Sequence, residues 1–266
     1  MRYFVEFAYN GSAFHGSQRQ PNAVSVQEVM EEAFTTVLRQ PVALTFAGRT
    51  DAGVHAEQMF AHFDYEGLES TTPSSNPSLL SERLNALLPP TIAVRRIFPV
   101  PDDAHARFSA VERTYEYRIT THKDPFGTGQ VTRVAPGLDM EAMNAAAQLL
   151  IGKHDFASFC KVHTDVKTTF CTISHAKWSV KSDMPLQPRS GLYPAGEAVF
   201  TISADRFLRN MVRAVVGTLF EVGRGKRSID DFRAVIEAHN RCAAGQSAPP
   251  SGLYLTHITY PAEISS

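Results

Sequence analysis

The sequence is poor in cysteine and in long apolar runs. Its 266 residues include three cysteines, Cys160, Cys171 and Cys242, and no CxxC pair. A disulfide framework or a thiolate zinc site is therefore not expected. No apolar stretch approaches the ~18 residues of a membrane-spanning helix, and the first residues lack the apolar region of a signal peptide. We expect a soluble protein of the reducing cytoplasm, neither membrane-bound nor exported.

The net charge is also small, since 26 basic and 27 acidic residues give a formal charge of −1. This near-zero charge argues against a histone-like, purely electrostatic binder of nucleic acid. Any polyanionic partner would have to meet local clusters of positive charge. Arginines gather in two such regions, Arg95, Arg96, Arg107, Arg113 and Arg118, and then Arg206, Arg209, Arg213, Arg224 and Arg227.

Hydrophobic periodicity predicts a βαββαβ order of elements in the first half of the chain and the same order, with one added helix, in the second. Alternation at Tyr3, Val5 and Phe7 indicates a strand, and Ser25 followed by Glu28 is typical of a capped helix start. The other expected strands are 42–47, 59–63, 92–98, 114–120, 172–180, 198–203 and 253–258, and the other expected helices are 79–88, 140–151, 207–222 and 229–238.

Two such halves indicate an α+β protein with two ferredoxin-like, RRM-like units, each with an antiparallel sheet covered by helices on one face. At roughly 150 residues per domain, the length allows one large domain or two ordinary ones. The Pro- and Asp-rich stretch 99–103 reads as a junction, which predicts domains 1–108 and 109–266. No internal repeat is visible, so the duplication rests on element order alone. Stretches 70–78 and 184–196 read as loops.

Segment 46–56 reads Phe-Ala-Gly-Arg-Thr-Asp-Ala-Gly-Val-His-Ala and follows a predicted strand. A bend between Gly48 and Gly53 would present Arg49 and Asp51 outward from a rigid support. Two other interpretations remain open for these residues alone. Asp51 could form an ordinary turn by bonding its own backbone. Asp51 and His55 could also be metal ligands, but no third ligand stands at a recognisable spacing.

The segment resembles the Gly-Arg-Thr-Asp-Ala-Gly-Val-His hallmark of the tRNA pseudouridine synthases of the TruA type. The resemblance runs from the first strand to Tyr260. Two departures are visible, since Ser17 stands where members often carry Trp, and Phe46 stands where a small residue or Cys is common. Further matching segments occur in the same order at 18–20, 105–110, 113–117, 155–159, 211–213 and 251–255.

The resemblance implies that Asp51 is the nucleophile that converts uridine to its C-glycoside isomer in the anticodon stem-loop of tRNA. A carboxylate is an anion at neutral pH and suits this chemistry. Whether it attacks the sugar, adds to the base or assists a glycal route stays open. The resemblance further implies that Arg213 orients Asp51 and that Tyr115 stacks on the flipped base. Leu253 would complete the base pocket, and Arg49 would bind phosphate or help to displace the base.

The same resemblance implies a homodimer, an RNA-binding cleft between the two units, and neither a metal ion nor another cofactor. On the predicted helix 207–222 with its first flanking residue, four polar side chains share one arc. Such a stripe is often an ordinary solvated face, but the family match favours one turned toward RNA. We expect Tyr117 in the core, and structural roles for His55 and His105. The four residues of the arc are Arg206, Arg209, Asn210 and Arg213.

Two other classes of protein would each require a signature motif in the sequence. A tandem RRM module shares the βαββαβ order, but its RNP1 octamer is absent from the sequence. A zinc base deaminase would need H-x-E and P-C-x-x-C signatures, and both are missing. A tRNA-modifying enzyme is therefore the expected class.

Overall fold

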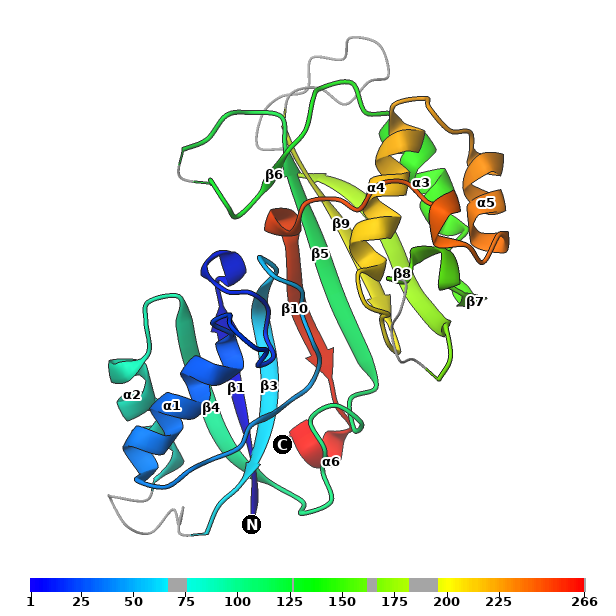
Figure 1. The fold of residues 1–266 in the computed structure, drawn as a ribbon. Coiled ribbons are helices and arrows are strands. Elements are labelled where there is room, and N and C mark those ends of the chain that lie inside the picture. Colours follow the sequence, from blue (N-terminus) through cyan, green and yellow to red (C-terminus); the bar gives the residue numbers. More distant parts are fainter. Residues whose placement is uncertain (67–75, 126, 162–166, 182–195, 266) are drawn as a thin grey trace. The chain divides into compact units, whose positions relative to one another are not determined.

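The structure is a computed structural model that describes residues 1–66, 76–125, 127–161, 167–181 and 196–265. The chain divides into two compact units, and each is described by itself (Figure 1). Unit 1 consists of Met1–Glu112 and Leu255–Ser266, and unit 2 of Arg113–Tyr254. The predicted loops at 70–78 and 184–196 fall largely outside the described residues.

Unit 1 is built on an antiparallel sheet with β1 (Arg2–Tyr9) between β3 (His55–Asp64) and β4 (Ile92–Val100). The short strand β2 (Thr45–Phe46) pairs with β3, and β10 (Leu253–Thr259) also lies next to β3. The strand expected from Tyr3, Val5 and Phe7 is confirmed, and it is central, because Val5 pairs with Ala61 of β3 and with Ile97 of β4.

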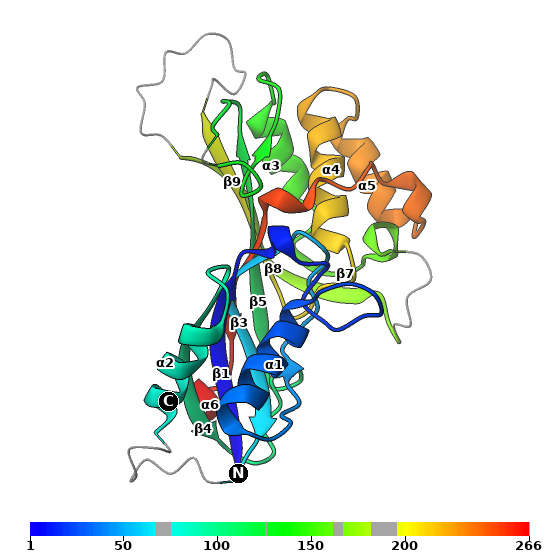
Figure 2. The same cartoon turned by 60° about the vertical axis from the view of Figure 1, so that its left-hand side comes forward.

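Helices α1 (Val26–Leu38) and α2 (Pro77–Leu87) cover the sheet of unit 1 (Figure 2). The predicted cap of α1 is confirmed, because the Ser25 side chain accepts a hydrogen bond from the Glu28 N–H at 3.2 Å. Arg39, in the left-handed conformation with φ 56°, ends the helix two residues before Pro41. Phe34 of α1 packs edge-to-face on Phe63 of the sheet at 5.0 Å.

The chain end packs on unit 1 through Tyr260. Its ring packs edge-to-face on Phe4 at 5.3 Å and on Phe60 at 5.2 Å, and its hydroxyl donates to the Ala106 carbonyl at 2.5 Å. Burial of an aromatic side chain removes a large apolar area from water, which explains why 255–266 belongs to unit 1. The division expected from sequence, 1–108 and 109–266, placed this segment in the second domain. A short helix, α6 (Ala262–Ser265), follows.

The strands of unit 2 lie in the order β5-β9-β8-β7 with antiparallel neighbours, and the short β6 pairs with β5 in parallel. In the described residues the strands of both units therefore pair mostly antiparallel, and with the helices they confirm the α+β class. The strands are β5 (Glu112–Thr120), β6 (Thr132–Arg133), β7 (Gly152–Asp155), β8 (Phe170–Lys181) and β9 (Glu197–Ala204), and the helices are α3 (Met140–Gln148), α4 (Met211–Gly223) and α5 (Ile229–Glu237).

The predicted helix 207–222 begins four residues later than expected. Asn210 has φ 67°, a left-handed conformation that an α-helix does not contain, and its side-chain amide donates to Ser247 at 2.7 Å. The expected polar arc of Arg206, Arg209, Asn210 and Arg213 on one helix is therefore wrong. Arg213 alone of these residues lies on α4.

Short 3-10 turns connect several elements, and one of them leads directly into β10. They are Gly11–Ala13, Ala157–Phe159, Arg241–Ala243 and Pro250–Gly252. No helix in the described residues is long and apolar enough to cross a membrane.

Candidate active site

Asp51 lies half-buried in the loop between β2 and β3 of unit 1. Its backbone carbonyl accepts a hydrogen bond from the Val54 N–H at 3.2 Å. Gly53 has φ 77°, in the left-handed region where a residue without Cβ has no steric penalty. The predicted bend before Gly53 is thus present, and it sets the direction in which the chain leaves Asp51.

The residue before Asp51 is fastened to the segment that follows β1. The Thr50 N–H donates to the Ser17 hydroxyl at 2.8 Å, and the Thr50 carbonyl accepts from the Ser17 N–H at 3.3 Å. The Thr50 and Tyr9 hydroxyls share a further hydrogen bond of 2.8 Å. Ser17 is fully buried, so these bonds are shielded from water and hold the backbone beside Asp51 rigidly.

The other side of the loop is braced by the same segment. The Gly53 N–H donates to the Phe14 carbonyl at 3.2 Å, and the Gly11 N–H donates to His55 Nδ1 at 3.1 Å. A Cβ at position 11 would lie 1.9 Å from the Val54 carbonyl oxygen, so the two backbones approach as closely as a glycine allows. The buried His55 imidazole fits the structural role predicted for it.

The two residues that depart from the family pattern, Ser17 and Phe46, both make defined contacts in unit 1. Ser17 is the residue that holds Thr50, and Phe46 is a core residue whose ring packs edge-to-face on Phe7 at 5.2 Å. Arg49, in contrast, is exposed, as the predicted contact with phosphate requires. The bracing role of Ser17 was not predicted. The one signal for this role in the sequence is that Ser17 follows Gly16, in the segment after the first strand that also contains Gly11.

Arg213 of unit 2 is held in place by the chain that leads to β10. Its Nε donates to the Ala248 carbonyl at 2.7 Å, and its own carbonyl accepts from the Ala248 N–H at 2.9 Å. One turn further along α4, Gly217 admits the Gln246 carbonyl, which would lie 1.8 Å from a Cβ. From Ala248 the chain runs through Pro250–Gly252 to the buried Leu253. Unit 2 thus joins Arg213 to the segment that carries Leu253.

Tyr115 lies on β5 of unit 2, half-buried, with its ring edge-to-face against Phe207 at 5.1 Å. Tyr117 is fully buried, and its hydroxyl donates to the Pro249 carbonyl at 2.8 Å. Burial raises the pKa of this hydroxyl far above its usual value, so Tyr117 stays neutral. Its predicted place in the core is confirmed. Asp51 and Arg49 belong to unit 1, whereas Tyr115, Arg213 and Leu253 belong to unit 2.

The metal-ligand interpretation finds no support in the described residues. Among them, no three His, Cys, Asp or Glu side chains come together in a way that could hold a metal ion. His55 already uses Nδ1 as the acceptor for the Gly11 N–H.

Comparison with known proteins identifies the family. A family model described as tRNA pseudouridine synthase matches residues 7–109 and 146–261. A relative from Parabacteroides distasonis, named tRNA pseudouridine synthase A, is 52% identical over 263 residues, covering 99% of this chain and 97% of the relative. A protein of the same name from Porphyromonas gingivalis is also 52% identical, with 99% and 98% covered. One from Pseudoalteromonas atlantica is 40% identical, with 98% and 93% covered.

The matched regions include the loop that carries Asp51 and the start of α4, which carries Arg213. The segments that carried the resemblance in the sequence also lie within them, apart from residue 110 at the end of 105–110 and from 113–117, which fall between the two matched ranges. The chain belongs to the tRNA pseudouridine synthase family.

Proposed function

We propose that this chain isomerises uridines in the anticodon stem-loop of tRNA, with Asp51 as the nucleophile. Membership of the tRNA pseudouridine synthase family gives the reaction and the class of substrate. The observation that supports Asp51 is the bracing of its loop, in which Thr50 on one side and Gly53 on the other are bonded to segment 9–17. A reacting carboxylate needs such a support because small displacements reduce the rate strongly.

The reaction exchanges one bond for another without any redox change. The bond between N1 of uracil and C1′ of ribose breaks, the base turns, and a bond forms between C5 and C1′. N1 gains a proton and C5 loses one, so substrate and product are isomers. Asp51 supplies an anionic oxygen, which serves in each of the three routes, attack on the sugar, addition to the base or assistance to a glycal.

The remaining site residues have roles that follow from their chemistry. The Arg213 guanidinium, held through its Nε bond to the Ala248 carbonyl, would orient the Asp51 carboxylate. Tyr115 would stack on the flipped base, with Phe207 supporting its ring from the side. Leu253 would pack on the base, and the exposed Arg49 would bind a phosphate.

The proposal also covers the finer architecture and the assembly. Unit 1 has the element order β1, α1, β2, β3, α2, β4, which supports a ferredoxin-like unit carrying the Asp51 loop. Unit 2 would be the second such unit, carrying Tyr115 and the arginine-rich segment before α4. The family resemblance supports a cytoplasmic homodimer. Light scattering should give twice the chain mass of 29.3 kDa, and a value near 29.3 kDa would contradict the dimer.

The proposed function is tested by incubating the purified protein with unmodified tRNA transcripts, without additives, and mapping pseudouridine by position. We expect pseudouridine at uridines of the anticodon stem-loop. A transcript in which those uridines are replaced by cytidine is the control and should stay unmodified. Binding of the transcript without any pseudouridine would instead support the rival RNA-binding module.

A further inference from the structure

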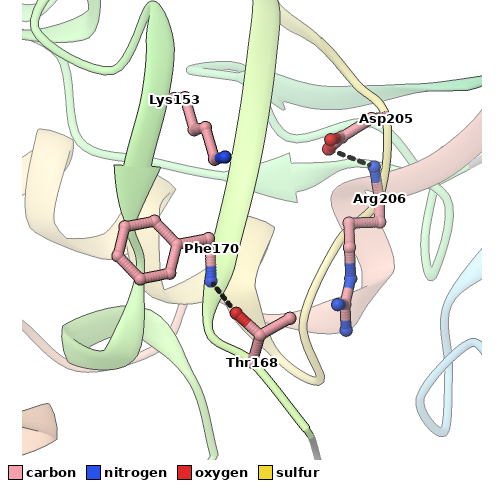
Figure 3. Close-up of a pocket in the computed structure, with 5 residues that line it drawn as sticks. All are labelled: Lys153, Thr168, Phe170, Asp205 and Arg206. Carbon is pink, nitrogen blue, oxygen red and sulfur yellow. Dashed lines mark hydrogen bonds between the residues drawn. The ribbon is translucent and has the colours of Figure 1, made fainter.

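Unit 2 contains an open pocket of about 380 Å³ that none of the proposed catalytic residues lines. Figure 3 shows the residues arranged around it, which are Lys153 from β7, Thr168 just before β8, Phe170 at the start of β8, and Asp205 and Arg206 after β9. Its volume lies within the range of roughly 300–1,000 Å³ that is typical of small-ligand sites. The pocket combines two cations, one carboxylate, one hydroxyl and one aromatic ring.

Hydrogen bonds to backbone N–H groups hold two of the segments that carry the pocket's largely exposed side chains. Asp205 Oδ1 accepts hydrogen bonds from the N–H groups of Thr172 at 2.8 Å and Arg206 at 2.7 Å, which fixes the turn that carries Arg206. The Thr168 hydroxyl accepts from the Phe170 N–H at 3.2 Å and fixes the start of β8. Lys153 Nζ lies 6.0 Å from the centroid of the Phe170 ring, at the outer limit of a cation–π contact.

The charges and surfaces of the pocket match one nucleotide of RNA. Lys153 and Arg206 form no ion pair with a carboxylate in the described part of the chain, and with Asp205 they leave a net charge of about +1, the complement of a single phosphodiester. Phe170 exposes 48% of its surface, which is unusual for a phenylalanine and suits base stacking. A carboxylate accepts hydrogen bonds from a ribose hydroxyl or a base amino group.

We propose that this pocket binds a nucleotide of the tRNA other than the target uridine, with its phosphodiester between Lys153 and Arg206 and its base on Phe170. Asp205 accepts a hydrogen bond from the ribose or the base and so disfavours a ligand that is phosphate alone. Arg206 is the chain neighbour of Phe207, whose ring contacts Tyr115 at 5.1 Å. One stretch of RNA can therefore contact both places. This inference rests on the proposed function for the identity of the RNA.

The test compares tRNA binding by the variants Lys153→Gln, Arg206→Gln and Phe170→Leu with the control Lys177→Gln. Lys177 is exposed on the same strand as Phe170, seven residues or roughly 23 Å further along, and carries the same charge. We expect each of the two cation variants in the pocket to weaken binding about tenfold and to lower the salt slope, d log K/d log[salt], by about one phosphate contact.

The aromatic variant should leave a different signature. Phe170→Leu should weaken binding by about 5- to 100-fold with an unchanged salt slope, and Phe170→Tyr should bind like wild type, because loss of stacking removes no charge. The turnover number at saturating tRNA should stay within about twofold of wild type for all these variants, with the loss confined to KM. Pocket variants that bind tRNA no more weakly than Lys177→Gln would overturn the proposal.

Two further measurements distinguish a failure of the pocket proposal from a failure of the proposed function. Adenosine 5′-monophosphate, titrated alone, should compete with tRNA only weakly, and strong competition that disappears in Lys153→Gln would show a site for free nucleotides instead. If the wild-type protein binds tRNA without forming pseudouridine, the proposed function fails, while the binding losses of the variants still decide for or against the pocket. If it forms pseudouridine and the losses are absent, the pocket alone is refuted.

Discussion

The Ser17 hydroxyl accepts a hydrogen bond of 2.8 Å from the backbone N–H of Thr50, and both residues are buried. Asp51 follows Thr50 directly, so this bond fixes the backbone from which the proposed nucleophile projects. The segment that follows β1 therefore takes part in shaping the site, although none of its side chains has a proposed chemical role. Ser17 is also one of the two positions at which the sequence departs from the family pattern.

Replacing Ser17 by alanine should weaken this support. The change leaves the buried Thr50 N–H without its acceptor, which costs about 1–3 kcal/mol. We expect a lower urea midpoint and a larger fall in pseudouridine formation than the loss of folded protein explains. The exposed Ser12, whose hydroxyl donates to Asn10, is the matched control, and Ser12→Ala should stay within about 0.5 kcal/mol of wild type. Equal behaviour of the two variants would exclude the bracing role.

Much of the fold could be predicted because its signals are local. The alternation of the first strand, the Ser25 cap of α1 and the periodicity of α2 and α5 are set by neighbouring residues, and the structure contains each of these elements close to its predicted bounds. The Gly48–Gly53 bend was likewise readable, since Gly53 adopts a conformation that other residues adopt at a cost.

The features that could not be predicted depend on contacts between distant segments. The start of α4 is set by the left-handed Asn210 and its bond to Ser247, 37 residues away, and no periodicity reports such a contact. The packing of Tyr260 on unit 1 and the bond between Ser17 and Thr50 are of the same kind. The pocket around Phe170 likewise gathers three separate stretches of chain, and no local pattern indicates that they come together.

Tyr115 should tolerate loss of its hydroxyl better than loss of its ring. Tyr115→Phe keeps the aromatic face and the edge-to-face contact with Phe207, whereas Tyr115→Ala removes both. Since stacking on a base is worth roughly 1–3 kcal/mol, we expect the alanine variant to capture the flipped base far more weakly. Binding of tRNA and single-turnover rates measure this, and indistinguishable Phe and Ala variants would exclude stacking.

The stability of unit 1 should depend on His62 at acidic pH. Burial lowers the pKa of this imidazole to about 4, with Arg2 and His105 adding to the effect, and its Nδ1 accepts from the Ala106 N–H at 3.1 Å. The unfolded chain takes up a proton near pH 6.5 and the folded one does not. Stability contributed by the neutral His62 is thus present above pH 6.5 and lost as the pH falls toward 4, by about 2–3 kcal/mol.

A pair of variants isolates this contribution. His62→Asn retains an acceptor for the Ala106 N–H but has no proton to gain, so its urea midpoint should fall less than that of wild type between pH 6.5 and 4. The exposed His15 serves as the control in the same unit, and His15→Asn should follow the wild-type curve. Parallel curves for all three proteins would show that His62 does not titrate as its burial requires.

The most direct test of the account is pseudouridine formation by Asp51→Asn. The Val54 N–H binds the backbone carbonyl of residue 51, and Thr50 is held by Tyr9 and Ser17, so none of these bonds depends on the carboxylate. An amide is a very poor nucleophile toward carbon. We expect wild-type urea stability and tRNA affinity with no detectable pseudouridine. Substantial activity, with deamidation to Asp excluded by mass spectrometry, would contradict the account, as would inactivity caused by a large loss of stability.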